Sequence, residues 1–187
     1  MNTFDLRTRP GLPPALAALV KEIPRNTWRG HPNFGSMVKF WMERHMMFRD
    51  LMARITRDTQ ILLDGNTDAQ SYGARLSRMG GLFLGELHSH HGVEDHHYFP
   101  QLQALDQAVE GAFELLEADH HVMDALLAEF ADGANGVLQQ LGAPDELRAA
   151  TERFHTDLTK LSGFLERHLT DEEDIVVPVI LKSGFEG

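Results

Sequence analysis

Two stretches of this sequence match each other offset by offset: residues 90–100 read HHGVEDHHYFP and residues 168–178 read HLTDEEDIVVP. A histidine, a glutamate four residues later, a second acid directly after it and a proline at the end coincide in both stretches. Side chains four residues apart lie on one face of a helix, so each stretch presents an imidazole beside a carboxylate. One such pair is weak evidence of a site, but its repetition predicts two equivalent helices that face a common centre.

A companion repeat accompanies the first. His45 and His120 are each followed by large apolar residues at offsets of three, seven and ten. His45 lies 75 residues before His120, and His90 lies 78 residues before His168. The chain therefore reads as two helical hairpins, related by duplication or by a common functional demand.

Hydrophobic periodicity predicts an all-α fold. Apolar residues recur at intervals of three and four over residues 34–63, and similar patterns run from Thr67 or Asp68 to about 105, from after Asp106 to 141, and over 145–180. No window of alternating β-branched residues competes with these helices. We expect an up-down-up-down four-helix bundle over residues 33–187, preceded by a proline-rich N-terminal arm over 1–32 with a short helix near 15–22.

Four glycines lie inside the second predicted helix: Gly80, Gly81, Gly85 and Gly92. Each costs about 1 kcal/mol relative to alanine in a helix interior, so something should compensate. Close packing of a neighbouring helix is the simpler explanation, and room beside a cofactor is the alternative.

Composition limits the kinds of function. The net charge is −11 and no cluster of lysine or arginine occurs, so neither nucleic acid nor an anionic membrane is an expected partner. The absence of cysteine excludes disulfides, thiolate metal sites, iron–sulfur clusters and thiol catalysis. No apolar stretch reaches the roughly 20 residues that span a bilayer, and the N-terminus has no leader pattern, so we expect a cytoplasmic protein. Against this background, 11 histidines are the natural candidates for metal ligands.

A pseudo-twofold axis between the two halves would bring the repeated histidines and glutamates to the middle of the bundle, where four-helix bundles hold metal pairs. These residues are His45, His90, Glu94, His120, His168 and Glu172. Buried groups of this kind would be very costly without a metal.

Two neighbours compete with these candidates. Periodicity alone does not choose between His90 and His91, because each borders the apolar face and each has an acid four residues later. The match with the second repeat favours His90. On the third helix, apolar residues at inward spacing favour His120 over His121.

These spacings resemble those of hemerythrin-like, or HHE cation-binding, domains over about residues 34–181. The family signature is a lone histidine in helix one, His-x-x-x-Glu in helix two, a histidine in helix three and His-x-x-x-Glu before a proline in helix four. The chain carries it at the six positions named above. The resemblance implies a hemerythrin-like four-helix bundle with two iron ions in an oxo- or hydroxo-bridged di-iron centre. Imidazole and carboxylate by themselves suit iron, manganese or zinc, so the choice of iron rests on the resemblance.

The third helix departs from the family pattern. Hemerythrins place a second histidine four residues after the first, and this chain has Asp124 there. Asp124 is therefore a further candidate ligand, the alternative being a carboxylate that orients an imidazole from behind. With Asp124 as a ligand, about one of the roughly twelve positions on two octahedral irons stays open.

The resemblance implies a non-haem di-iron protein that binds dioxygen, or a similar small diatomic ligand, reversibly for storage or sensing. The two matching stretches contain no lysine, serine or cysteine to act as nucleophile or proton donor, so no catalytic residue is predicted. The alternative is a di-iron oxidoreductase acting on peroxide, nitric oxide or ferrous iron. A third possibility is an interaction bundle that binds adventitious metal. No particular protein partner is predicted.

Overall fold

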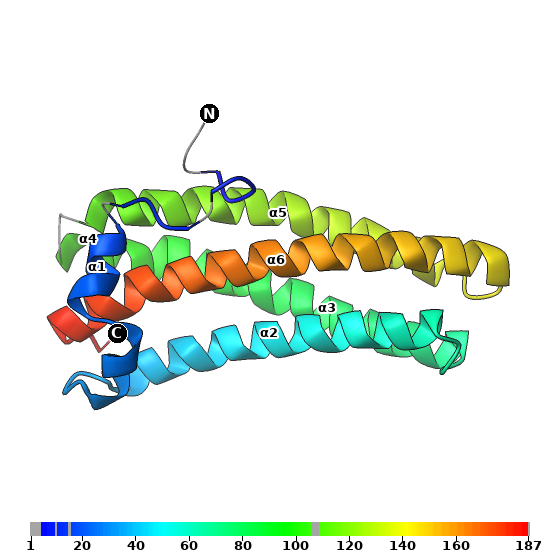
Figure 1. The fold of residues 1–187 in the computed structure, drawn as a ribbon, viewed down its shortest axis with the longest axis horizontal. Helices are drawn as coiled ribbons and strands as arrows, with labels where there is room; N and C mark the ends of the chain where they lie inside the picture. Colours follow the sequence, from blue (N-terminus) through cyan, green and yellow to red (C-terminus); the bar gives the residue numbers. More distant parts are fainter. Residues whose placement is uncertain (1–4, 10, 15, 106–108, 187) are drawn as a thin grey trace. The chain divides into compact units, whose positions relative to one another are not determined.

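The computed structural model describes residues 5–9, 11–14, 16–105 and 109–186, and every regular element in that part of the chain is helical. The elements in chain order are α1 (Ala17–Glu22), η1 (Arg25–Gly30), α2 (Ser36–Leu63), α3 (Ala69–Val93), η2 (Glu94–Tyr98), α4 (Phe99–Leu105), α5 (Glu110–Leu138) and α6 (Pro144–Ser183). Figure 1 draws α2, α3, α5 and α6 as long coiled ribbons. Among the described helices, none combines the length and the apolar character that crossing a membrane requires.

The helices lie within a few residues of their predicted bounds, which confirms the all-α prediction. α2 begins at Ser36 and ends at Leu63. At the start of α3, the carboxylate of Asp68 accepts a hydrogen bond from the backbone N–H of Ser71 at 2.8 Å, as expected of a helix cap. Ala15 and Asp106, where two of the predicted helices begin, lie outside the described residues. The short 3-10 helix η1 was not predicted.

A π-helical turn, η2, interrupts the second predicted helix. The backbone N–H of Phe99 donates to the carbonyl of Glu94, five residues earlier rather than four. Pro100 follows directly, and it lacks an N–H and crowds the carbonyl four residues before it, so a regular α-helix is disfavoured at this point. The wider turn begins with Glu94 and Asp95, two acids of the first repeat.

The chain divides into two compact units. The first comprises residues 1–46, 90–122 and 166–187, and the second comprises residues 47–89 and 123–165. Each long helix contributes to both: the first unit takes the beginnings of α2 and α5 and the ends of α3 and α6. An up-down-up-down chain path produces this alternation of beginnings and ends, and that arrangement remains a prediction.

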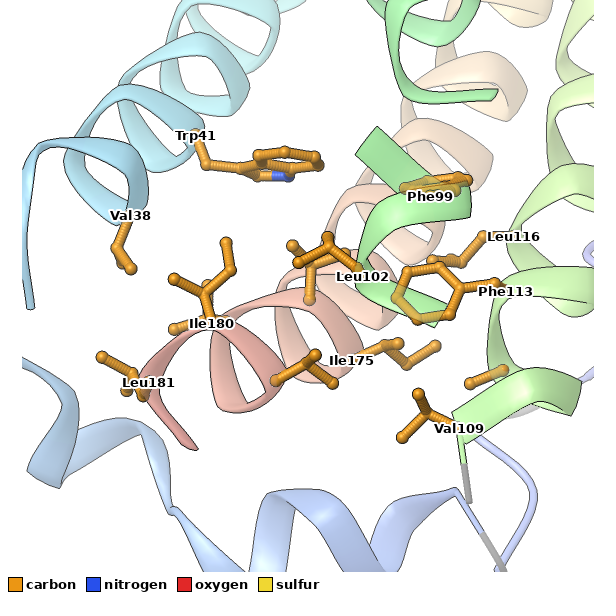
Figure 2. Close-up of a cluster of buried hydrophobic side chains, with 14 of the residues drawn as sticks. Val38, Trp41, Phe99, Leu102, Val109, Phe113, Leu116, Ile175, Ile180 and Leu181 are labelled. Carbon is orange, nitrogen blue, oxygen red and sulfur yellow. The ribbon is translucent and has the colours of Figure 1, made fainter. Parts of the chain in front are cut away.

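The first unit has its own apolar core, drawn in Figure 2. α2 contributes Val38 and Trp41, α4 contributes Leu102, and α6 contributes Ile175 and Ile180, none of them more than 2% exposed. Burying one large side chain of this kind contributes about 1.5–3 kcal/mol. This core fixes the segments that carry the repeated histidines.

The segment predicted as an N-terminal arm packs into the first unit. Leu6 and Trp28 are each 2% exposed, and the side chain of Arg9 is fully buried. The indole N–H of Trp28 donates to the carbonyl of Ile23 at 2.8 Å, and the guanidinium of Arg25 lies over the Trp28 ring at 5.0 Å. Two arginines are thereby held close to the bundle helices.

Close contact with a neighbouring side chain does not explain most of the four glycines in the second predicted helix. A Cβ at Gly80 would make an ordinary contact with Phe130 at 3.5 Å. No described atom beyond the local backbone would lie within 4 Å of a Cβ at Gly81, Gly85 or Gly92. A tight approach occurs instead at Gly133 in α5, where a Cβ would lie 2.9 Å from the ring of Phe154.

Candidate metal centre

Seven ionisable side chains of the first unit form two groups with the geometry of metal ligands. The two-histidine group consists of His45, His90, Glu94 and Glu172, and the three-histidine group consists of His91, His120 and His168. Within each group, one ligand atom per residue lies within 4.8 Å of every other. All seven side chains are buried except that of His90, which is partly exposed.

Glu94, the first residue of the π-turn, faces both groups. Its Oε1 lies 3.0 Å from Nε2 of His90, in the two-histidine group. Its Oε2 lies 3.7 Å from Nε2 of His120, in the three-histidine group. One carboxylate thus reaches toward both groups, as a carboxylate that bridges two cations would.

Glu172 makes the same division from α6. Its Oε1 lies 3.2 Å from Nε2 of His45, and its Oε2 lies 3.5 Å from Nε2 of His168. The indole N–H of Trp41 donates a hydrogen bond to Oε1 and fixes the orientation of the carboxylate. The two glutamates therefore join the two groups from opposite halves of the sequence repeat.

Many polar atoms that converge here make no hydrogen bond with any described residue. They are both carboxylate oxygens of Glu94, Oε2 of Glu172, both ring nitrogens of His91 and of His168, and Nε2 of His45 and of His120. Each unsatisfied buried polar atom costs about 1–3 kcal/mol, and folded proteins leave few of them. A cation is the partner that satisfies imidazole and carboxylate lone pairs together, so the residues fit a metal.

Burial and mutual charge move the pKa values of these groups apart. Burial, together with the charge of Glu172, raises the pKa of Glu94 well above its usual range. Burial acts in the same sense on Glu172, but His45 and its neighbours outweigh it and hold the pKa of Glu172 well below the usual range. Burial opposes protonation of His45, yet Glu172 and Glu173 raise its pKa to about 9, whereas burial lowers the pKa of His90 to about 3. In the metal-free protein, His45 therefore holds a proton at neutral pH that a cation would displace.

The second acid of each repeat lies behind a histidine of the other half. Asp95 Oδ1 lies 2.7 Å from Nδ1 of His120, and Glu173 Oε1 lies 3.1 Å from Nδ1 of His45. A carboxylate on this nitrogen fixes the tautomer and the ring orientation and leaves Nε2 for a metal. Neither acid was assigned a role from the sequence, although its place in both repeats was a visible signal.

The structure brings six of the seven predicted ligands together: His45, His90, Glu94, His120, His168 and Glu172. Asp124 is not among them, because its side chain is exposed and it belongs to neither group. This geometry therefore gives no support to Asp124 as a ligand. His121 is likewise exposed, in agreement with the preference for His120.

The residue that sequence reasoning missed is His91. It is 3% exposed, stacks on His120 with ring centroids 4.0 Å apart, and meets His168 edge-on at 5.2 Å. The match between the repeats favoured positions that hold a histidine in both, and Leu169 stands at the corresponding position of the second. Consecutive side chains point about 100° apart around a helix, so His90 and His91 can serve different groups.

Comparison with known protein families agrees with this geometry. The family described as Hemerythrin HHE cation binding domain matches residues 36–180, from the beginning of α2 into α6, and the match includes all seven side chains. No curated protein and no solved structure matches the chain. The chain belongs to the hemerythrin HHE cation-binding domain family.

Proposed function

We propose that this protein holds two iron ions, one at each histidine group, and binds dioxygen or a similar small diatomic ligand reversibly. The observation that carries the proposal is the division of the Glu94 and Glu172 oxygens between the two groups, which suits two bridging carboxylates. The choice of iron rests on the family resemblance, since the ligand types also suit manganese or zinc. A ferrous pair supplies the electrons that dioxygen needs on binding and recovers them on release.

The five histidines make the two groups unequal. An octahedral ion has about six positions. If both glutamates bridged and one solvent-derived bridge were shared, three histidines would complete one ion and two histidines would leave about one position open on the other. The open position would then lie on the side of His45 and His90, and a single position would suit end-on binding of a diatomic ligand.

The surroundings favour binding over turnover. The Trp41 ring meets the rings of Tyr98 and His90 edge-on, with centroids 5.3 and 6.3 Å away, so aromatic side chains lie beside the two-histidine group. The matching stretches hold no lysine, serine or cysteine to act as a nucleophile toward a substrate. Apart from the partly exposed His90, the side chains of the two-histidine group are buried, which limits the access of solvent protons to a bound ligand.

The test is the optical spectrum of the iron-loaded, reduced protein as dioxygen is admitted and then removed under argon. The expected result is an absorption band that appears with dioxygen, disappears under argon and returns over repeated cycles. Glu94→Ala should abolish the band, because it removes a bridge. His121→Ala should leave it unchanged, because that imidazole is exposed and outside both groups.

Other outcomes would assign a different function. Rapid, sustained consumption of peroxide, nitric oxide or ferrous iron that depends on Glu94 would establish a di-iron oxidoreductase instead. A purified protein that cannot retain about two irons per chain under metal-replete conditions would overturn the di-iron centre and leave adventitious metal binding.

A further inference from the structure

Two arginines of the N-terminal segment contact carboxylates that lie behind histidines of the metal centre. Arg9 lies before α1, and Arg25 begins η1. Both arginines and all their partners described below belong to the first unit. Each arginine reaches a different histidine group.

Arg9 is held by two aspartates in the interior of the first unit. Its Nε and Nη2 donate to Oδ2 of Asp171 at 3.0 and 2.8 Å. Its Nη1 donates to Oδ1 of Asp119 at 2.6 Å, and Nη2 donates to Oδ2 of the same carboxylate. Asp119 Oδ2 lies 3.6 Å from Nδ1 of His168, so Arg9 fixes a carboxylate behind the three-histidine group.

Arg25 makes the corresponding contact on the other side of the centre. Its Nη1 donates to Oε2 of Glu173 at 2.7 Å, its Nε donates to Asp174 at 2.5 Å, and its Nη2 donates to the carbonyl of Thr170 at 2.8 Å. The other oxygen of Glu173, Oε1, lies 3.1 Å from Nδ1 of His45. Arg25 therefore fixes the carboxylate behind the two-histidine group.

We propose that Arg25 is a positioning residue for the two-histidine group, acting through Glu173. Arg9 positions the three-histidine group through Asp119 in the same way. A guanidinium that binds a carboxylate fixes its position and directs its remaining lone pairs, which holds the imidazole in the tautomer and orientation that a metal needs. The N-terminal segment thus sets the metal affinity of the two halves separately. This inference rests on the proposed two-metal function.

Anaerobic titration of the metal-free, full-length chain with cobalt(II) in competition with a chelator measures the two binding constants. Arg25→Gln should weaken one constant by about 10–100-fold, the usual effect of losing such a partner, and leave the other unchanged. Arg75→Gln is the matched control. The side chain of Arg75 is 33% exposed, similar to the 39% of Arg25. Arg75 pairs with Asp58 and Thr67 rather than with a carboxylate behind a ligand. Both binding constants of Arg75→Gln should therefore stay at the wild-type values.

Combination with a ligand variant assigns each effect to one half. His45→Gln already removes a ligand from the two-histidine group, so adding Arg25→Gln should change little. Adding Asp119→Asn to His45→Gln should weaken the remaining ion by a further factor of about 10–100, because it acts on the other half. Arg25→Lys retains the charge and should recover part of the affinity that Arg25→Gln loses.

Wild-type constants in Arg25→Gln would overturn the inference, and two cobalt ions per wild-type chain would leave the metal centre standing. An equal loss at both halves would also overturn it, since that pattern indicates only a general loosening of the fold. Fewer than two ions in the wild type would instead refute the metal centre. If Arg25→Gln has less helical circular dichroism than Arg75→Gln, then Glu173→Gln decides by the same criterion, because it keeps the side-chain volume.

Discussion

His91 has no histidine counterpart in the second half of the chain, where Leu169 stands in its place. The other four histidines form two corresponding pairs, His45 with His90 and His120 with His168, whose ring centroids lie 5.2 and 5.0 Å apart. From the match of the two repeats, we expect the fully buried Leu169 to have on the two-histidine side the place that His91 has on the other. An apolar side chain at this point would leave the last coordination position of the proposed centre open.

Leu169→His should close that position. The variant should retain two irons but lose the absorption band that depends on dioxygen, because a third imidazole occupies the site of the diatomic ligand. Leu169→Met is the control, since it keeps an apolar side chain of similar volume and should keep the band. An undiminished band in Leu169→His would show that the open position lies elsewhere.

His91 and Asp124 test the revised ligand set against the one predicted from the sequence. His91→Ala should lower the amount of iron retained after dialysis against a chelator relative to the wild type, because it removes one of three imidazoles from its group. Asp124→Ala should retain the wild-type amount. The reverse result would restore the aspartate and remove the histidine.

Metal affinity should rise with pH. The pKa of His45 is raised from its ordinary value of 6.5 to about 9, so the metal-free protein carries a proton there at pH 7 that a metal must displace. Each displaced proton makes the apparent affinity rise about tenfold per pH unit, so affinity should increase up to about pH 9 and level off above it. Proton release during iron titration in a weakly buffered solution measures this directly, and an affinity that is constant between pH 7 and 9 would contradict it.

At the scale of the helices, the sequence predicted existence and approximate bounds but not the π-turn. Apolar side chains every three to four residues determine where an amphipathic helix buries its face, so periodicity is sufficient for α2 and α6. Proline is not sufficient for the π-turn: Pro100 follows it, whereas the matching Pro178 lies inside an uninterrupted α6. Whether a π-turn forms beside a proline depends on the packing around that proline, and the local sequence pattern does not predict this packing.

The open glycines of α3 are positions where helix stability can be gained. Gly81 and Gly85 are exposed, and an added Cβ would meet no described atom within 4 Å. Alanine at either position should raise the free energy of unfolding by about 0.5–1 kcal/mol, through reduced backbone entropy of the unfolded chain and better helix propensity. Gly73→Ala is the contrast, because its Cβ would lie 2.5 Å from a methyl group of Leu141 and force that side chain to move.

Urea denaturation of the metal-free variants measures these differences. A loss of stability in Gly81→Ala and Gly85→Ala would show that a close neighbour does pack there, as the sequence first indicated.

At the scale of the whole molecule, the sequence predicted those site residues that occur at matching positions in both halves of the chain. The duplicated spacing identified six of the seven residues that form the two groups, because both halves present the same side chains to one centre. His91 breaks the duplication and was missed for that reason. The contacts of Arg9 left no pattern at all, since it pairs with Asp171 across 162 positions of the chain and lies in a segment without helical periodicity.

The division of two glutamates between two groups of histidines leads to one central claim, that two iron ions lie side by side in the first unit. X-ray diffraction from crystals of the iron-loaded chain, with data collected at the iron absorption edge, tests it most directly. The account predicts two anomalous peaks about 3–4 Å apart, one beside His45 and His90 and one beside His91, His120 and His168. Each peak should contact one oxygen of Glu94 and one of Glu172. A single peak, or two peaks that share neither glutamate, would contradict the account.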